Sequence, residues 1–268
     1  MSDPRPIGVF DSGVGGLTVA AALARELPAE TILYLGDTAR LPYGTKSAET
    51  VTRYTERNLD FLVGRGVKMV VVACNTASAL ALPSIAEPVP LLGVVEPGAE
   101  RAAAVSAGRV GVVGTEATIR SGAYPAALAR LRPELEVTSV ACPLFVPLVE
   151  EGWFDDPVTE TVARRYLEPL LAAGIDTLVL GCTHYPLLTP LLARIAGAGV
   201  ALVDSAQAVA ARVRVELARR DALAAAGGGG EHLFVTDDTE RFARLAQRIL
   251  GRDARLELVD IAHARSPS

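Results

Sequence analysis

Short runs of apolar, mostly β-branched residues alternate along the chain with alanine- and leucine-rich stretches whose apolar positions recur with helical spacing. The apolar runs predict strands at residues 7–10, 31–35, 68–73, 91–95, 109–114, 136–141, 177–181, 200–203, 232–235 and 256–259. The amphipathic stretches predict helices at residues 17–26, 48–64, 119–131, 157–173, 187–196, 206–225 and 239–250. Such alternation is typical of α/β proteins, in which helices flank parallel sheets and ligands bind at the carboxyl ends of the strands.

Two segments of the first half of the chain resemble two segments of the second half. Residues 7–13 resemble 110–115, and residues 71–76 resemble 179–184. In each half, the first segment contains a glycine and the second a cysteine, separated by 66 and 71 residues. This weak repeat favours two similar domains, each with a cysteine after a strand, that face one cleft. The alternative is the ordinary repetition of strand–loop–helix units in any α/β protein.

Residues 227–230 form a run of four glycines, the clearest candidate for a flexible linker. The segment that follows is below the ~40 residues that a small domain needs to fold alone. We therefore expect the run to join a helix to a strand inside one domain.

The composition indicates a globular protein that does not bind nucleic acid. Half of the 268 residues are hydrophobic, 21% are charged, and the formal net charge is -5. The arginines are scattered and form no basic patch. The most apolar run, 69–82, is interrupted by polar residues and is too short to span a membrane, and the N-terminus lacks the pattern of a secretory signal. A cytoplasmic protein without membrane partners is expected.

The chain has three cysteines, an odd number that argues against a disulfide framework. Cys74 and Cys182 each follow a predicted strand and precede polar residues, which favours reactive thiols. Cys142 has apolar neighbours and is expected to fill the core. Burial as core filler is the alternative for the other two cysteines as well. With His184 they make a three-ligand metal site conceivable, but Cys-x-His is not a zinc spacing, and no metal is expected.

Two loops that follow predicted strands carry further polar groups. The glycine-rich loop 11–17 matches neither a P-loop nor a dinucleotide fingerprint. Its glycines are expected to let the backbone approach a small ligand while Asp11 and Ser12 present polar groups, although Asp11 is also a candidate helix N-cap. The loop 37–44 contains Pro42 and Gly44, which are suited to a turn that exposes backbone N–H groups to a carboxylate.

Six blocks of the chain, in order, resemble the motifs of glutamate racemases in the aspartate/glutamate racemase superfamily. The blocks are FDSGVGGLT at 10–18, GDTAR at 36–40 with PYG at 42–44, ACNTASA at 73–79, GVVEPGA at 93–99, PLFVPLVE at 143–150 and GCTHYPLL at 181–188. Residues beyond about 205 carry no sharp motif. The resemblance implies an α/β fold with two similar domains, 1–96 plus 206–268 and 97–205, and an active site in the cleft between them.

The resemblance also implies an activity and the residues that perform it. Cys74 and Cys182 are expected to exchange the α-proton of glutamate without a cofactor, assisted by Asp11, His184 and Glu150. Glu151 is the alternative to Glu150. The residues expected to bind substrate are Asp11, Ser12, Pro42, Tyr43, Gly44, Cys74, Asn75, Thr76, Thr115, Thr118, Cys182, Thr183 and His184. The expected role is the supply of D-glutamate for peptidoglycan by a homodimer.

Paired cysteines suit this chemistry because racemisation removes a proton from one face of the α-carbon and returns one to the other face. A thiol with an ordinary pKa of about 8.5 serves as base or acid near neutral pH. Competing hypotheses are an aspartate racemase, a decarboxylase of small diacids, a non-catalytic binding protein for acidic amino acids, and a thiol redox protein. The last is disfavoured because the chain has no C-x-x-C motif.

Overall fold

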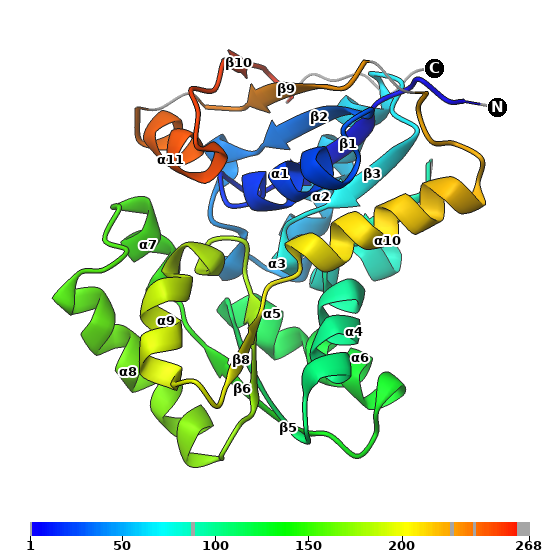
Figure 1. Cartoon of the computed structure of the whole chain (residues 1–268). Coiled ribbons are helices and arrows are strands. Elements are labelled where there is room, and N and C mark those ends of the chain that lie inside the picture. The colour runs from blue at the N-terminus through cyan, green and yellow to red at the C-terminus, as the bar shows by residue number, and fades with distance from the viewer. Residues whose placement is uncertain (1, 87–88, 226–227, 238–239, 262–268) are drawn as a thin grey trace.

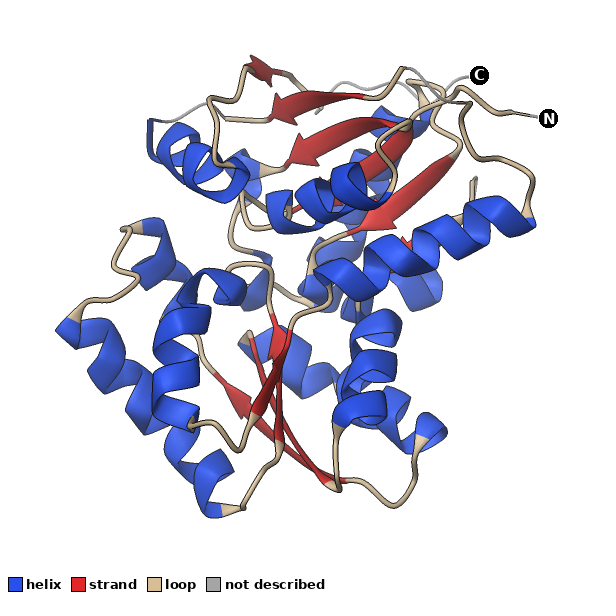
Figure 2. Cartoon of the chain, in the orientation of Figure 1, coloured by secondary structure: helices blue, strands red, loops and turns tan. Residues whose placement is uncertain are grey.

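The computed structural model describes residues 2–86, 89–225, 228–237 and 240–261. The chain forms two parallel β-sheets, each flanked by helices on both faces, in two lobes (Figures 1 and 2). We call the six-stranded sheet and its helices the first lobe, and the four-stranded sheet and its helices the second lobe. No helix in the described ranges is long and apolar enough to cross a membrane.

The first lobe combines the N-terminal part of the chain with its C-terminal part (Figure 1). Its strands, in spatial order, are β10 (Leu256–Leu258), β9 (Gly230–Val235), β2 (Thr31–Gly36), β1 (Ile7–Asp11), β3 (Met69–Val72) and β4 (Leu91–Gly93). One face packs against α1 (Leu17–Glu26), α10 (Ala206–Arg219) and α11 (Glu240–Leu250). The other face packs against α2 (Ala48–Val63) and α3 (Asn75–Leu80). Because both faces are covered, β1 and β3 are buried along their whole length, which explains their uninterrupted apolar runs.

The second lobe is formed by the middle of the chain. Its strands, in spatial order, are β6 (Glu136–Ala141), β5 (Arg109–Gly114), β7 (Thr177–Gly181) and β8 (Ala201–Val203). The apolar core on one face includes residues of α7 (Phe145–Glu150), α8 (Pro157–Ala172) and α9 (Thr189–Ala196), and that on the other includes α4 (Val95–Val105) and α6 (Ala123–Leu131). The short α5 (Glu116–Ser121) lies against α3 of the first lobe.

The internal repeat predicted from the sequence is present in the topology. The order β2-β1-β3-β4 in the first sheet has its counterpart in β6-β5-β7-β8 in the second, and β9 and β10 extend only the first sheet. All the strand pairs are parallel within the described residues. In the first sheet β3, the neighbour of β1, ends two residues before Cys74, and in the second sheet β7, the neighbour of β5, ends directly before Cys182.

Every predicted strand is present, but the predicted helix 119–131 is wrong as a single element. It is split into α5 and α6 at Gly122, whose φ of 66° lies in the left-handed region that favours glycine. The predicted strand 91–95 is also too long. It ends at Gly93, and α4, which the apolar pattern did not reveal, begins at Val95.

The predicted helix 206–225 ends early, at Arg219. The residues after α10 are held by a buried lysine, because Nζ of Lys68 donates a hydrogen bond to the carbonyl oxygen of Ala222 at 2.8 Å. Lys68 also pairs with Glu30 at 2.6 Å, and both side chains are almost fully buried. This pair fastens the segment after α10 to the first sheet at the amino end of β3. Two predicted features, the start of the helix 239–250 and part of the glycine run 227–230, lie outside the described residues; Gly230 begins β9.

Candidate active site

The loops that carry the predicted site residues meet between the two lobes. In the first lobe, Asp11 ends β1 and Cys74 directly precedes α3. In the second, Thr115 caps α5 and Cys182 follows β7. Side-chain hydrogen bonds between these loops join the two lobes. The expectation that ligand-binding groups gather at the carboxyl ends of the strands therefore fits the fold.

Cys74 is buried, with 5% of its surface exposed. Its thiol donates a hydrogen bond to Oγ of Ser12 at 3.7 Å. Burial and the nearby Asp11 carboxylate raise the pKa of Cys74 to about 12, although hydrogen bonds with Ala77 and Ser12 act in the opposite direction. This end of the site thus favours the protonated thiol.

Asp11 is fully buried and joins the two lobes. Its Oδ2 accepts hydrogen bonds from the backbone N–H groups of Gly13 at 3.2 Å and Gly16 at 3.0 Å. Its Oδ1 accepts one from Oγ1 of Thr183 in the second lobe at 3.2 Å. Helix α1 begins after Gly16 without a side-chain cap, so the alternative interpretation of Asp11 as the N-cap residue is wrong.

The surroundings of Cys182 differ in charge from those of Cys74. The thiol is 7% exposed, and its Sγ lies 3.9 Å from Nδ1 of His184. The other ring nitrogen of His184, Nε2, lies 3.4 Å from Oε1 of Glu150, within ion-pair distance but without hydrogen-bond geometry. Burial alone lowers the pKa of His184, yet Cys182 and Glu150 outweigh it and raise the pKa to about 10. This end of the site thus favours the protonated form of the imidazole beside Cys182.

The structure distinguishes the two adjacent glutamates that the sequence left as alternatives. Glu150 is largely buried and faces His184. Glu151 is half exposed and forms an ion pair at 2.5 Å with Arg241 of α11 in the first lobe. Only Glu150 is therefore in a position to act on the imidazole.

Three threonine hydroxyls form a buried triangle across the lobes. Oγ1 of Thr76 lies 3.0 Å from that of Thr115 and 3.2 Å from that of Thr118, and the last two are 3.0 Å apart. A Cβ atom at Gly44 would lie only 2.5 Å from Cβ of Thr115, so this close approach requires glycine. Oδ1 of Asn75, the residue after Cys74, also accepts a hydrogen bond across the lobes, from the hydroxyl of Tyr124. The structure thus brings together all of these predicted residues.

The remaining predicted residues, Pro42 and Tyr43, belong to the loop 37–44 and differ in exposure. Pro42 is exposed, whereas Tyr43 is buried and its hydroxyl donates a hydrogen bond to Asp37. Nδ2 of Asn58 donates to the same hydroxyl at 3.0 Å, and Nε of Arg40 donates to Asp37 at 2.8 Å. The hydroxyl of Tyr43 thus stabilises the loop through these hydrogen bonds. Only the backbone of Tyr43 is then available to bind a ligand. Asp37 was not predicted as a site residue; its position at the end of β2 was the available signal.

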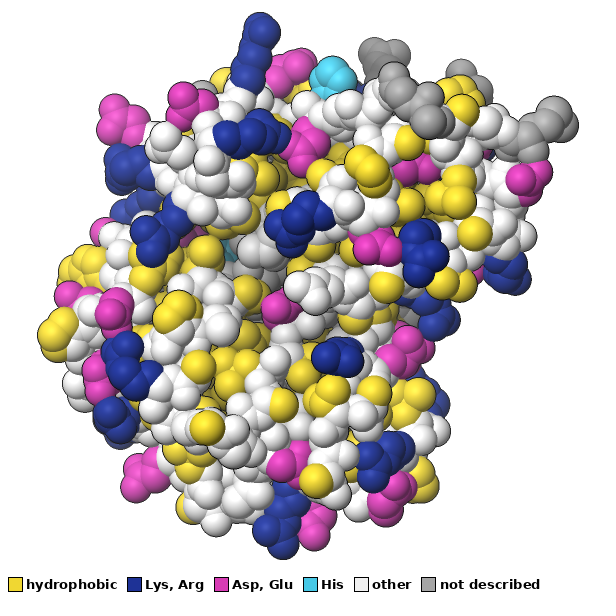
Figure 3. All heavy atoms as spheres, in the orientation of Figure 1, with side chains coloured by type: hydrophobic (Ala, Val, Ile, Leu, Met, Phe, Trp, Pro, Cys, Tyr) yellow, Lys and Arg dark blue, Asp and Glu magenta, His cyan; other side chains and the backbone are white. Residues whose placement is uncertain are grey.

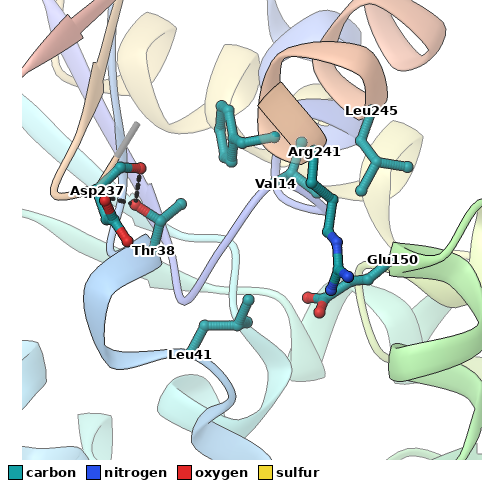
Figure 4. Close-up of a pocket in the computed structure, with 8 residues that line it drawn as sticks. Val14, Thr38, Leu41, Glu150, Asp237, Arg241 and Leu245 are labelled. Atoms are coloured by element: carbon teal, nitrogen blue, oxygen red, sulfur yellow. Dashed lines mark hydrogen bonds between the residues drawn. The ribbon is translucent and has the colours of Figure 1, made fainter. Parts of the chain in front are cut away.

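A cavity of about 240 Å³ opens beside these loops. It is lined by Val14, Thr38, Leu41, Glu150, Asp237, Arg241, Phe242 and Leu245. Figure 4 shows Glu150 of α7 and Arg241 of α11 pointing into this cavity from opposite lobes. Glu150 therefore connects the cavity to His184 and Cys182.

The described residues contain no group of three or more His, Cys, Asp and Glu side chains that could hold a metal ion. Cys142 is buried in the apolar core of the second lobe, and burial raises the pKa of its thiol. On the face seen in Figure 3, acidic and basic side chains are interspersed, and neither sign dominates.

Comparison with known proteins agrees with this geometry. Residues 7–213 match the family model described as Asp/Glu/Hydantoin racemase. The chain belongs to this racemase family. A protein of Geobacter metallireducens named glutamate racemase is 54% identical over 252 residues, which cover 92% of this chain and 93% of the relative.

Solved structures of family members share the whole fold. A glutamate racemase of Bacillus anthracis matches with a TM-score of 0.92 and 40% identity, covering 96% of this chain and 97% of that one. A glutamate racemase of Francisella tularensis, solved in complex with D-glutamate, matches with a TM-score of 0.91 and 37% identity, covering 97% and 99%. The parallel sheets and the two-domain architecture implied by the six blocks are confirmed.

Proposed function

We propose that this protein is a glutamate racemase that moves the α-proton of glutamate between Cys74 and Cys182. The observation that carries the proposal is the equivalent placement of these two buried thiols after β3 and β7 of two repeated sheets. The family membership and the D-glutamate bound to the Francisella relative support the reaction and the substrate.

In the direction from L- to D-glutamate, the Cys182 thiolate removes the α-proton from one face. The Cys74 thiol then donates its proton to the opposite face of the carbanionic intermediate. The enzyme is left with a Cys182 thiol and a Cys74 thiolate, which is the state needed for D-glutamate. This assignment of cysteine to enantiomer comes from the family resemblance, and the cationic imidazole beside Cys182 supports it.

The polar neighbours of each thiol have separate tasks in this mechanism. His184, held by Glu150, supports negative charge on Cys182 and is near enough to exchange a proton with it. Asp11 disfavours negative charge on Cys74 and so keeps this thiol ready as the acid. Charges arranged before the reaction act strongly in a site with little water.

Substrate is held, in this proposal, by polar groups from both lobes. The proposed binding residues are Asp11, Ser12, Pro42, Tyr43, Gly44, Cys74, Asn75, Thr76, Thr115, Thr118, Cys182, Thr183 and His184. For Pro42, Tyr43 and Gly44 the backbone provides the contacts, since the Tyr43 hydroxyl is already bound by Asp37.

The mechanism requires no cofactor, because the two thiols supply both the base and the acid. A pyridoxal-phosphate enzyme needs a lysine for its Schiff base. Lys46 and Lys68 are the chain's two lysines. Lys68 is buried in its pair with Glu30 at the amino end of β3, opposite the end that carries Cys74.

The wider setting follows from the proposed reaction. We propose that the protein supplies D-glutamate for peptidoglycan in the cytoplasm, as a homodimer without nucleic-acid or membrane partners. Residues 1–96 plus 206–268 and residues 97–205 are proposed as the two domains. Closure of these domains around the substrate would exclude water from the carbanion.

The test is circular dichroism of the purified protein, dialysed against a chelator, with L-glutamate or L-aspartate as substrate. We expect the L-glutamate signal to decay to zero without added cofactor and the L-aspartate signal to persist. Decay of the L-aspartate signal instead would show that aspartate, and not glutamate, is the substrate. Activity that returned only with pyridoxal phosphate or a metal ion would contradict the two-thiol mechanism.

A further inference from the structure

Tyr124 of α6 is a buried tyrosine that none of the sequence motifs singled out as a site residue. Its side chain is 1% exposed, and its hydroxyl donates a hydrogen bond to Oδ1 of Asn75 at 2.7 Å. This bond crosses from the second lobe to the residue that directly follows Cys74. Burial raises the pKa of the phenol, so the hydroxyl keeps its proton and remains a donor.

The ring of Tyr124 also contacts the segment that carries the other cysteine. A Cβ atom placed on Gly181, directly before Cys182, would lie 3.1 Å from Cε2 of the ring. A Cβ atom on Gly98 would lie 3.2 Å from the Tyr124 hydroxyl oxygen. The two glycines therefore make room for the tyrosine, and one side chain touches the neighbours of both thiols.

The hydrogen bond from Tyr124 determines which way the amide of Asn75 faces. An amide whose oxygen accepts from a fixed phenol has its two N–H donors on the other side. Those donors suit a carboxylate, which accepts hydrogen bonds only. An amide that loses such a partner is free to rotate, and its buried oxygen is left unsatisfied.

We propose that Tyr124 is a positioning residue that orients the Asn75 amide toward a substrate carboxylate and holds the two cysteine loops in register. This inference rests on the proposed racemase function. It predicts that the hydroxyl of Tyr124 acts mainly on substrate binding, and only through Asn75. The hydroxyl of Tyr124 itself does not contact the substrate, because Asn75 occupies it.

The test compares Tyr124→Phe with the wild-type protein in glutamate racemisation. The phenylalanine keeps the ring against Gly181 and removes only the hydroxyl. We expect KM to rise about tenfold and kcat to fall less than about threefold, since orientation of a binding group is lost while both thiols remain. Asn75→Ala should raise KM at least as much. The double variant should be no worse than Asn75→Ala alone, because both changes remove one interaction.

Tyr185→Phe is the matched control. Tyr185 is likewise fully buried, and its hydroxyl donates to the backbone carbonyl of Cys142 at 2.8 Å. Both variants should lower Tm by a similar amount, since each removes one buried hydrogen bond, and only Tyr124→Phe should change KM. An unchanged KM in Tyr124→Phe, additive losses in the double variant, or an equal KM change in Tyr185→Phe would overturn the positioning role. A wild-type protein that does not racemise glutamate would refute the proposed function, and this inference with it.

Discussion

The two ends of the candidate site, around Cys74 and around Cys182, share a backbone setting and differ in charge. Cys74 follows β3, the neighbour of β1, Cys182 follows the equivalent strand β7, the neighbour of β5, and both thiols are buried. Cys74 has the Asp11 carboxylate and a serine hydroxyl as neighbours. Cys182 has an imidazole whose pKa is raised to about 10. A repeated scaffold thus supports two sites of opposite polarity.

This difference has a direct use in a two-base reaction. A racemase with two thiols needs one as a thiolate and the other as a thiol at the start of each turnover. Two identical environments would leave the position of the single proton undetermined. In the proposed mechanism, the carboxylate beside Cys74 favours the thiol at that end, and the imidazole beside Cys182 is the group that distinguishes the other end.

The largest expected effect comes from removing either thiol. Cys74→Ala and Cys182→Ala should each lower racemisation by about 10³-fold or more, because the transfer loses its base or its acid. In heavy water, each variant should still exchange the α-proton of one enantiomer. We expect Cys74→Ala to exchange L-glutamate and Cys182→Ala to exchange D-glutamate, as measured by NMR.

Cys142→Ala is the control for this pair, because it removes a buried thiol outside the site. It should retain racemisation and lose only stability, by about 1 kcal/mol. Racemisation by Cys74→Ala at a near wild-type rate would contradict the two-thiol mechanism and return both cysteines to a packing role.

The comparison of the two ends also shows what the sequence was able to predict. The strands followed from apolar runs, because a strand covered on both faces needs an uninterrupted apolar sequence. Their parallel arrangement followed from the alternation with helical stretches, and the repeat followed from the two pairs of similar segments. The break of one predicted helix at Gly122 was missed, since glycine in an alanine-rich stretch does not reveal its φ. The early end of α10 was missed because the buried Lys68–Glu30 pair depends on residues far apart in the sequence.

For the site, the sequence predicted residue types and could not predict partners. Motif blocks identified Cys74, Cys182, Asp11 and His184, but the charge difference between the two ends depends on distances through space. The choice of Glu150 over Glu151 required the geometry of α7. Asp37 and Tyr124 were missed for the same reason, because each acts on a predicted residue from another element.

The next largest effects should come from Asp11→Asn and His184→Asn, about 10²-fold on kcat with smaller changes in KM. Because the two enantiomers are equally stable, kcat/KM is equal in both directions, and rates alone do not distinguish the ends. The kinetic isotope effect of deuterium at the α-carbon of each enantiomer does distinguish the two ends. His184→Asn should enlarge the isotope effect for L-glutamate, which Cys182 deprotonates, and Asp11→Asn that for D-glutamate. Equal isotope effects for both enantiomers in both variants would contradict separate roles.

A smaller effect is expected at the Cys182 end from Glu150→Gln. Glu150 helps to raise the pKa of His184, so its removal should lower that pKa. Because the protonated imidazole is the useful form, activity is lost as pH rises through this pKa, and the alkaline limb of kcat should move to lower pH. At alkaline pH the loss should be about threefold to tenfold.

Glu151→Gln is the matched control for Glu150→Gln, since Glu151 pairs with Arg241 and does not face His184. Its pH profile should coincide with that of the wild-type protein, because exposed ion pairs contribute little. Equal shifts in both variants would show that the charge of α7 matters rather than the contact with the imidazole.

The smallest expected effect tests the Cys74 end through Ser12→Ala. The Ser12 hydroxyl opposes the rise in the pKa of Cys74, so its loss should raise that pKa further and lower the thiolate fraction. Alkylation of Cys74 by iodoacetamide at a fixed pH, followed by mass spectrometry, should slow by about threefold, because the thiolate is the nucleophile. Cys182 in the same digest should react at an unchanged rate. Ser78→Ala, which removes a hydroxyl bonded to the carbonyl of Val72, should not slow alkylation of Cys74. Equal slowing of both cysteines in Ser12→Ala would mean that access to the site changed, and the charge difference between its two ends would then need another explanation.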